Sequence, residues 1–409
     1  MKFASPLWFA FLGLFLSLLG GCGDDGAPAL DGGSDAAFGD AAADATVDAT
    51  ADAGGDTGPP PFNELPALSD LEPTWNELLP GGPTVCSRGS EFAFFVHPGT
   101  VNKVIVDFIG GGACWNADTC SFADALFADS VEPVRRAVAM AEPVGIYDRS
   151  RADNPFRDWT HVVVPYCTGD VHWGDARTEY GDGPGTPVVI NHRGAVNARA
   201  VLDWVYENVP APEQAFVTGC SAGSYGSIVW AAHLMEHYPG VRVVQLGDSG
   251  AGVITETFFR ESFPSWNATG ALPDWIPDLD PARVDIFELE LADLYIGIGD
   301  YYPGNVVAQY NTTFDENQTF FYEAMGGTGG AAAWSEKMIA STSRIVESTP
   351  NYRNFRAPGE QHCVIMQPNF YEVESNGVRL VDWIGDLVAG RNVENVACVD
   401  CSRPTPGTE

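Results

Sequence analysis

A turn of small residues around Ser221 most restricts how this chain can fold. The segment Gly219-Cys220-Ser221-Ala222-Gly223 joins a short strand-like run, residues 215–218, to an apolar-periodic segment, residues 224–238. Small residues on both sides of a serine, between a strand and a helix, are typical of the nucleophile elbow of an α/β hydrolase. The next backbone N–H, that of Ala222, can then face a developing oxyanion. Because 45 of the 409 residues are glycine, the motif can also arise by chance, and further features must support it.

Strand and helix patterns alternate on both sides of this turn. The alternation predicts an α/β fold with a mostly parallel sheet flanked by helices, here an α/β-hydrolase fold. Residues 255–300 are irregular and rich in Trp, Pro and Asp, which predicts a cap-like insertion over the carboxyl edge of the sheet. Strand patterns occupy residues 104–109, 161–167, 215–218, 241–246 and 306–311, and helical patterns occupy residues 194–207, 224–238 and 378–388.

A glycine loop supplies a second hydrolase feature. Gly110-Gly111-Gly112-Ala113 directly follows the strand pattern of residues 104–109. Glycines at this place let backbone N–H groups approach a carbonyl oxygen closely, as in HGGG-type oxyanion loops. A phosphate-binding loop is not supported, because no Lys-Ser/Thr pair follows the glycines.

The base must be a histidine that follows the nucleophile, because hydrolases of this kind present their residues in the order Ser, acid, His. His233, His237 and His362 follow Ser221. The first two lie on the predicted helix that leaves the turn, which carries them away from the hydroxyl. They are spaced like metal ligands, but no His-Glu-x-x-His pattern accompanies them. His362, in a loop before the last helix, is therefore the predicted base.

Two aspartates are candidates for the acid that orients this base. Asp315 follows the late strand pattern and precedes His362 by 47 residues. Asp248 ends the strand pattern that follows the nucleophile helix. Asp315 is the favoured choice and Asp248 stays open as the alternative, its other interpretation being a pocket-lining or turn residue.

Four segments together resemble the pectin acetylesterase/Notum family of carboxylesterases, over most of residues 80–400. The segments are Phe108–Asn116, Gly219–Ser224, Gly247–Gly250 and Gln361–Cys363. Ala113 stands where the family usually has a tryptophan, and Ser224 stands where the elbow often ends in a second glycine. These two departures leave the catalytic chemistry implied by the motifs intact and affect the choice of substrate.

The resemblance implies a serine carboxylesterase that acts through an acyl-enzyme, with no metal and no organic cofactor. The expected substrates are acetyl esters of polysaccharides. The alternatives are a long-chain lipid or acyl-protein esterase, or a non-catalytic surface-binding lipoprotein. The implied roles are Ser221 as nucleophile, Asp315 as acid, His362 as base, Gly112, Ala113 and Ala222 as oxyanion donors, and Gly111, Trp115 and Asp248 as lining of the substrate pocket.

The N-terminal residues predict export and a tether. Lys2, the apolar run Leu7–Leu19 and the small pair before Cys22 resemble a bacterial lipoprotein signal, residues 1–21, with an ordinary cleaved signal as the alternative. The apolar run is too short to cross a hydrocarbon layer of about 30 Å. Residues 22–62 are rich in Asp, Ala and Gly with little apolar bulk, which predicts a disordered tether before an esterase domain at residues 63–403.

Charge and cysteine content restrict the partners. The formal net charge is −34, and removing the nine aspartates of residues 23–61 leaves −25 on the rest. A chain this acidic argues against nucleic acid and anionic lipid as partners. We expect an ester substrate, membrane contact only through a lipid on Cys22, a monomer, and a location in the bacterial cell envelope. Eight cysteines follow Cys22, and this even number predicts disulfides without specifying their pairing.

Overall fold

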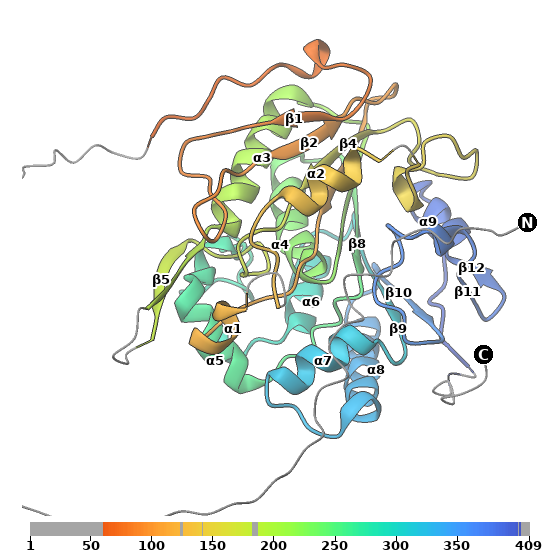
Figure 1. Ribbon diagram of the computed structural model, residues 1–409. Coiled ribbons are helices and arrows are strands. Elements are labelled where there is room, and N and C mark those ends of the chain that lie inside the picture. Colours follow the sequence, from red (N-terminus) through yellow and green to blue (C-terminus); the bar gives the residue numbers. More distant parts are fainter. Residues whose placement is uncertain (1–59, 123–125, 141, 182–186, 400, 402–409) are drawn as a thin grey trace, which may run out of the picture. The chain divides into compact units, whose positions relative to one another are not determined.

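The computed structural model (Figure 1) describes residues 60–122, 126–140, 142–181, 187–399 and 401. These residues all belong to one compact unit, Thr57–Glu409. The predicted signal peptide, Cys22 and nearly all of the predicted tether lie outside the described residues. Within the described ranges, no helix combines the length and hydropathy needed to cross a membrane.

An eight-stranded sheet forms the centre of this unit, with the strand order β1-β2-β4-β3-β7-β8-β9-β10. The two strands at one end, β1 and β2, run antiparallel to their neighbours, and the other six pair in parallel. The α/β-hydrolase fold and its mostly parallel sheet are thereby confirmed. The strands are β1 (Asn76–Leu78), β2 (Phe94–His97), β3 (Lys103–Phe108), β4 (Thr160–Val164), β7 (Gln214–Cys220), β8 (Arg242–Asp248), β9 (Val306–Thr312) and β10 (Tyr352–Ala357).

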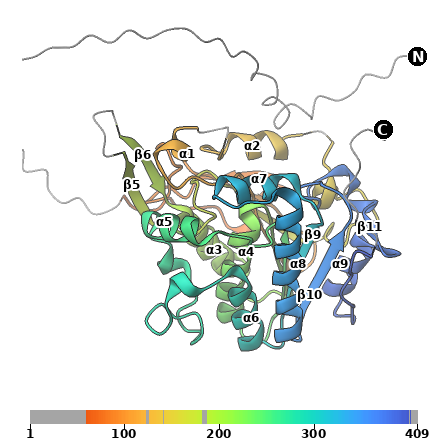
Figure 2. The ribbon, with the colours of Figure 1, turned by 90° about the horizontal axis from the view of Figure 1, so that it is seen from below.

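Helices cover both faces of this sheet (Figures 1 and 2). Successive side chains of a strand point to opposite faces, so one strand feeds two cores. In β3, Val104 and Val106 belong to one hydrophobic core and Ile105 to another. The first core includes residues of α3 (Gly194–Asn208), α4 (Ala222–His237), α6 (Leu291–Tyr301) and α8 (Gly330–Ser348), and the second includes residues of α9 (Leu380–Val388).

The segment predicted as an irregular cap, residues 255–300, contains two α-helices. The first, α5 (Glu256–Trp266), lines a cavity described below. The second, α6, contacts α4, α8, β9 and β10, and so belongs to the layer that covers the sheet. The cap is therefore smaller than expected. The remaining elements are α1 (Ala117–Ser121), α2 (Glu132–Val138), α7 (Glu316–Ala324), the hairpins β5 (Ala176–Tyr180) with β6 (Val188–His192) and β11 (Glu374–Ser375) with β12 (Val378–Arg379), and five short 3₁₀ turns.

Four disulfides pair all eight cysteines that follow Cys22. The bonds are Cys86–Cys167, Cys114–Cys120, Cys220–Cys363 and Cys398–Cys401. Such bonds persist in oxidising compartments, so the protein is an exported one.

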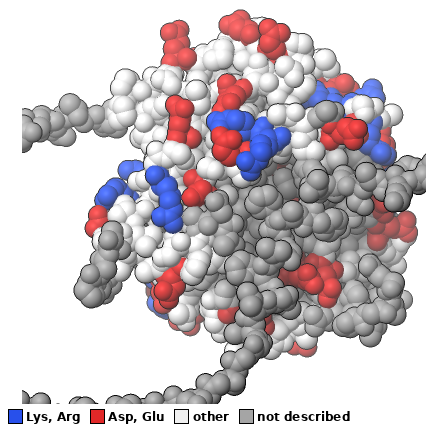
Figure 3. Space-filling model, in the orientation of Figure 1, with Lys and Arg blue, Asp and Glu red and all other residues white. Residues whose placement is uncertain are grey.

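One face of the molecule carries its acidic groups in a dispersed pattern. On the face shown in Figure 3, Asp and Glu side chains are spread apart, and Lys and Arg lie beside them. Pairs such as Arg151 with Asp153 and Arg391 with Asp386 are within salt-bridge distance. The described part of this face therefore presents no extended basic surface.

Candidate active site

Ser221 lies in a strained turn between β7 and α4. Its φ of 56° and ψ of −123° fall outside the regions that side chains favour, and its N–H donates to the Asp248 carbonyl at 2.8 Å. A Cβ on Gly219 would lie 2.3 Å from the Gly223 carbonyl oxygen, and one on Gly223 would lie 1.8 Å from the Phe108 carbonyl oxygen. Glycine is thus required on both sides of the serine, as the elbow motif predicts.

Asp315 and His362 are in direct contact. The His362 Nδ1 lies 2.9 and 2.8 Å from the two carboxylate oxygens of Asp315. This carboxylate is buried at the N-cap of α7, where it accepts hydrogen bonds from the Gln318 backbone N–H at 2.8 Å and from Gln318 Nε2 at 3.0 Å. Because an ionised carboxylate only accepts, Nδ1 of the histidine carries the proton and Nε2 is left as an acceptor.

The other ring nitrogen of His362 is free of hydrogen bonds to the described residues. His362 and Ser221 line the same cavity, and the His362 Nε2 is buried without a hydrogen-bond partner among the described residues. Catalytic hydrogen bonds are often long before substrate binds. The geometry therefore leaves Nε2 available to take the proton of the Ser221 hydroxyl.

Asp248 holds the backbone of the loop that carries His362. Its Oδ2 accepts hydrogen bonds from the backbone N–H groups of Val364 and Ile365 at 2.7 and 2.9 Å. It is fully buried and is not among the residues that line the cavity, which corrects the prediction that it does. Between the two candidate acids, the structure places Asp315, and not Asp248, on the histidine.

The buried Asp248 has a consequence for stability. Burial raises the pKa of Asp248 to about 6, although its hydrogen bonds oppose the shift. The pKa in the folded protein is thus above that of the unfolded chain, so the folded state binds the proton more tightly. The contribution of Asp248 to the free energy of unfolding therefore falls as the pH rises from about 4 to 6.

Asp248→Asn is expected to reduce this fall by about 1.4 kcal/mol per pH unit at most, which is the contribution of one proton. The asparagine Oδ1 can still accept from Val364 and Ile365, so the loop stays anchored. Urea unfolding at pH 4, 5 and 6 measures the slope. Asp170→Asn is the matched comparison, because burial also raises the pKa of Asp170 to about 6 at a place where it binds Gly194 and Thr168. A slope in Asp248→Asn equal to that of the wild type would contradict the assignment.

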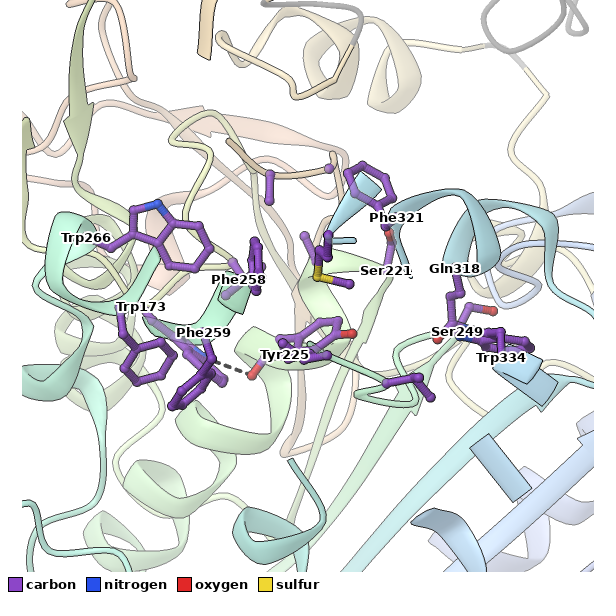
Figure 4. A pocket seen from close by; sticks show the side chains of 18 of the residues that line it. Trp173, Ser221, Tyr225, Ser249, Phe258, Phe259, Trp266, Gln318, Phe321 and Trp334 are labelled. Carbon is purple, nitrogen blue, oxygen red and sulfur yellow. Dashed lines mark hydrogen bonds between the residues drawn. The ribbon is translucent and has the colours of Figure 1, made fainter. Parts of the chain in front are cut away.

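A cavity open to solvent lies at Ser221 (Figure 4). The three residues predicted to supply oxyanion N–H groups, Gly112, Ala113 and Ala222, line it together with Ser221 and His362. The structure thus brings the six predicted residues of the catalytic centre, Asp315 behind His362 included, to one place.

Two further residues predicted to line the pocket lie behind its wall. Trp115 is buried and packs edge-to-face on Phe258, with ring centroids 4.7 Å apart, so Phe258 faces the cavity in its place. A Cβ on Gly111 would lie 2.6 Å from the Tyr166 ring, which shows that this glycine faces the protein interior. Neither residue is part of the lining.

The walls of the cavity are aromatic. Figure 4 shows Phe258, Phe259 and Trp266 of α5 on one side and Phe321 of α7 on the other. The polar Gln318 also lines it, but its amide is engaged by protein groups. Its Oε1 accepts from the Ala251 N–H at 2.8 Å, and its Nε2 donates to Asn311 and Asp315. The cavity therefore offers a ligand mainly apolar surface.

The glycine loop is held against the elbow by close backbone contacts. Gly112 has a φ of +74°, and a Cβ there would lie 1.8 Å from the Leu126 carbonyl oxygen. Behind the loop, His172 Nε2 bonds the Ile109 carbonyl at 2.9 Å, and burial lowers the pKa of His172 to about 4. His172 is therefore neutral and donates from Nε2 to the strand end that carries the loop. The sequence did not point to this residue, because it lies outside every motif.

Two groups of side chains in the described part of the chain have donor atoms close enough to hold a metal ion. They are Cys114, Cys120 and His192, and Cys220, His362 and Cys363. In both groups the cysteines are bonded to each other as disulfides, and a thiolate is the form that binds metal. These donor sets therefore do not fit a metal ion.

Residues 81–265 match the family model described as pectinacetylesterase. Over these residues, which are less than half of the chain, the protein is similar to the pectin acetylesterase family. The matched residues contain the glycine loop and Ser221 and end before Asp315 and His362. The family model therefore covers the candidate nucleophile, and the candidate acid and base rest on the geometry given above.

Two curated relatives come from Arabidopsis thaliana. Pectin acetylesterase 5 is 26% identical over 170 residues, which is 40% of this chain and 38% of the relative. Pectin acetylesterase 4 is 23% identical over 174 residues, which is 41% of each chain. The chain therefore spans about two fifths of the length of the curated relatives it matches.

Among solved structures, the Wnt deacylase Notum from Drosophila is similar in two crystal forms. One superposes with a TM-score of 0.53 at 18% identity, over 79% of this chain and 96% of Notum. The other superposes with a TM-score of 0.56 at 15% identity, over 78% and 94%. These superpositions show a shared fold.

Proposed function

We propose that this protein is a serine carboxylesterase that hydrolyses esters with an apolar acyl group. The observation that carries the proposal is the contact between His362 and Asp315 beside Ser221, at one end of an apolar cavity. A serine needs an adjacent base, and that base an orienting group, to become a nucleophile.

The reaction follows from these positions. As Ser221 Oγ attacks the ester carbonyl, its proton passes to His362 Nε2 and the carbonyl becomes an oxyanion. N–H groups at Gly112, Ala113 and Ala222 stabilise that charge. The carbon–oxygen bond to the alcohol then breaks, and the alcohol leaves with the proton from the histidine. Water, deprotonated by the same Nε2, attacks the acyl-enzyme and releases the acid and free Ser221.

The extent and lining of the cavity support an acyl group larger than acetyl. An acetyl group places only a methyl beyond its carbonyl carbon, whereas the cavity continues from Ser221 along the apolar side chains of Phe258, Phe259 and Trp266. Sugar hydroxyls placed against the phenylalanine walls would lose their hydrogen bonds. The acyl side of the ester is therefore the part that fits.

Acetylated polysaccharide is the second candidate substrate. The observation that favours it is the matching family model together with the two relatives named pectin acetylesterases. Acetate release from acetylated pectin, measured beside release of octanoate from a simple octanoyl ester, separates the two candidates.

A fluorophosphonate probe tests the proposal directly, because it reacts covalently with an activated serine. We expect one label per chain, located on Ser221 by peptide mass spectrometry, and no labelling after the protein is unfolded in urea. With p-nitrophenyl esters we expect kcat/KM to be at least about tenfold higher for octanoate than for acetate, because each buried methylene contributes ~0.8 kcal/mol. A label on another serine would contradict the assignment, and a preference for acetate would favour the second candidate.

The place of action is also part of the proposal. The lipoprotein-like signal before Cys22 and the tether of residues 22–62 support an esterase held by lipid at a bacterial envelope, acting as a monomer. Release of Cys22→Ser protein from the membrane fraction is the expected result, and its retention there would contradict the anchor.

A further inference from the structure

We propose that a second apolar cavity, behind Phe259, receives the far end of a long acyl chain whose carbonyl is at Ser221. Phe259 then determines which chain lengths fit. The inference rests on the proposed function, in which the first cavity holds the acyl group.

The two cavities share a wall. The second cavity lies next to the first. Four side chains line both of them, Trp173, Ile254, Phe259 and Phe263. One layer of side chains therefore separates the two spaces, and a movement of one of these side chains would join them.

Phe259 is the member of this wall that can turn. Trp173 is held by a hydrogen bond of 3.0 Å from its indole N–H to the Tyr225 carbonyl, drawn as the dashed line in Figure 4. Phe263 is buried and packs edge-to-face on Trp173, with ring centroids 5.5 Å apart. Phe259 is half-buried and contacts other rings without any polar anchor, so a change of its rotamer breaks no hydrogen bond.

The lining of the second cavity indicates hydrocarbon as its occupant. Beyond the shared wall it consists of four leucines and Glu290. The Glu290 carboxylate is exposed and pairs with Arg344 at 3.0 Å, so it is turned toward solvent and a cation. A sugar or a charged group in this space would lose its hydrogen bonds, whereas a methylene chain gains by burial. The four leucines are Leu272, Leu289, Leu291 and Leu294.

Leu294→Phe tests whether the second cavity is used. Leu294 is buried on α6 and lines the second cavity but not the first, so a phenylalanine there fills the distal space without touching Ser221. We expect kcat/KM for a palmitoyl ester to fall about tenfold and that for a butyryl ester to change less than about twofold. An equal fall for both esters would overturn the inference.

Phe259→Ala tests the wall. Removing the ring joins the cavities, and we expect the ratio of kcat/KM for palmitoyl over butyryl ester to rise about tenfold. The matched control is Phe258→Ala, one position earlier on α5, because Phe258 lines the first cavity only. Adding Leu294→Phe should cancel the rise in the Phe259→Ala protein, whereas in the Phe258→Ala protein it should lower the ratio by the same factor as in the wild type. Equal ratios in the two alanine variants would contradict a role for Phe259.

A binding measurement separates failure of this inference from failure of the proposed function. Palmitate binding to Ser221→Ala protein is measured by calorimetry, with and without Leu294→Phe. We expect about tenfold weaker binding when the second cavity is filled, whether or not any ester is hydrolysed. If no ester is a substrate, the proposed function fails while binding still decides the use of the cavity. Binding unchanged by Leu294→Phe would show that the space is only a packing defect.

Discussion

Ser221→Ala is expected to lower kcat for ester hydrolysis by about 10⁵-fold or more, because the acyl-enzyme then has no oxygen on which to form. His362→Ala is expected to have an effect of similar size, since residues that act as one unit are not additive. Asp315→Asn is expected to lower kcat by about 10⁴-fold. An amide can donate to His362 Nδ1, which favours the tautomer with its proton on Nε2, where it cannot accept from the serine.

The matched control for the acid is Asp248→Asn. Both aspartates are buried and both hydrogen-bond the segment that contains the base, but only Asp315 contacts the imidazole. We expect Asp248→Asn to lower kcat less than about tenfold. Turnover of a butyryl ester is measured with circular dichroism and thermal unfolding, so that a folding defect is not read as a catalytic one. A larger loss at Asp248 than at Asp315 would reverse the assignment.

The central sheet could be predicted because its strands are buried on both faces. The runs Lys103–Phe108 and Arg242–Asp248 each contain three residues that are valine, isoleucine or leucine, a pattern typical of strands buried on both faces. The edge strand β10 reads Tyr-Arg-Asn-Phe-Arg-Ala, with polar residues throughout, and its sequence gave no strand signal. Its two arginines and its asparagine interrupt the apolar side chains, which are nevertheless buried, so no continuous apolar run marks this strand.

The choice between Asp248 and Asp315 shows the limit of order along the chain. The two residues follow the neighbouring strands β8 and β9, which pair in parallel, so both reach the same edge of the sheet. Sequence position therefore places either carboxylate near His362. The contact is decided by α7, whose first turn places Gln318 against Asp315 and fixes the direction of that carboxylate.

The apolar cavity could not be predicted from the sequence for a related reason. Phe259 and Phe321 are far apart in the chain and line one space only because α5 and α7 meet above the sheet. Thr255, the N-cap of α5, donates its hydroxyl to the Met325 carbonyl at the end of α7, which ties the two helices together. Composition alone does not distinguish these aromatic residues from core residues, and only their placement makes them acyl-binding candidates.

The disulfide Cys220–Cys363 joins the two halves of the site through neighbouring residues. Cys220 directly precedes Ser221, Cys363 directly follows His362, and both are buried. The bond closes a loop with a sequence separation of 143, for which the loss of loop entropy in the unfolded chain amounts to ~5 kcal/mol. It also restrains the distance between Ser221 and His362. Asp248 holds the same loop only through Val364 and Ile365, the second and third residues after His362.

Replacing both cysteines of this bond with alanine is therefore expected to reduce stability and turnover together. We expect the free energy of unfolding in urea to fall by about 3–5 kcal/mol. We expect kcat at 20 °C to fall about 10- to 100-fold, because a shift of the histidine by about 1 Å is enough for such a loss. The matched control replaces Cys86 and Cys167, whose separation of 81 gives a comparable loss of stability without a bond beside Ser221 or His362. Both variants are expected to lose similar stability, so a difference in kcat between them reports the positioning effect alone. A fall in kcat confined to the variant without Cys220–Cys363 supports this effect. Equal values of kcat in the two variants would show that the bond stabilises the fold without holding His362.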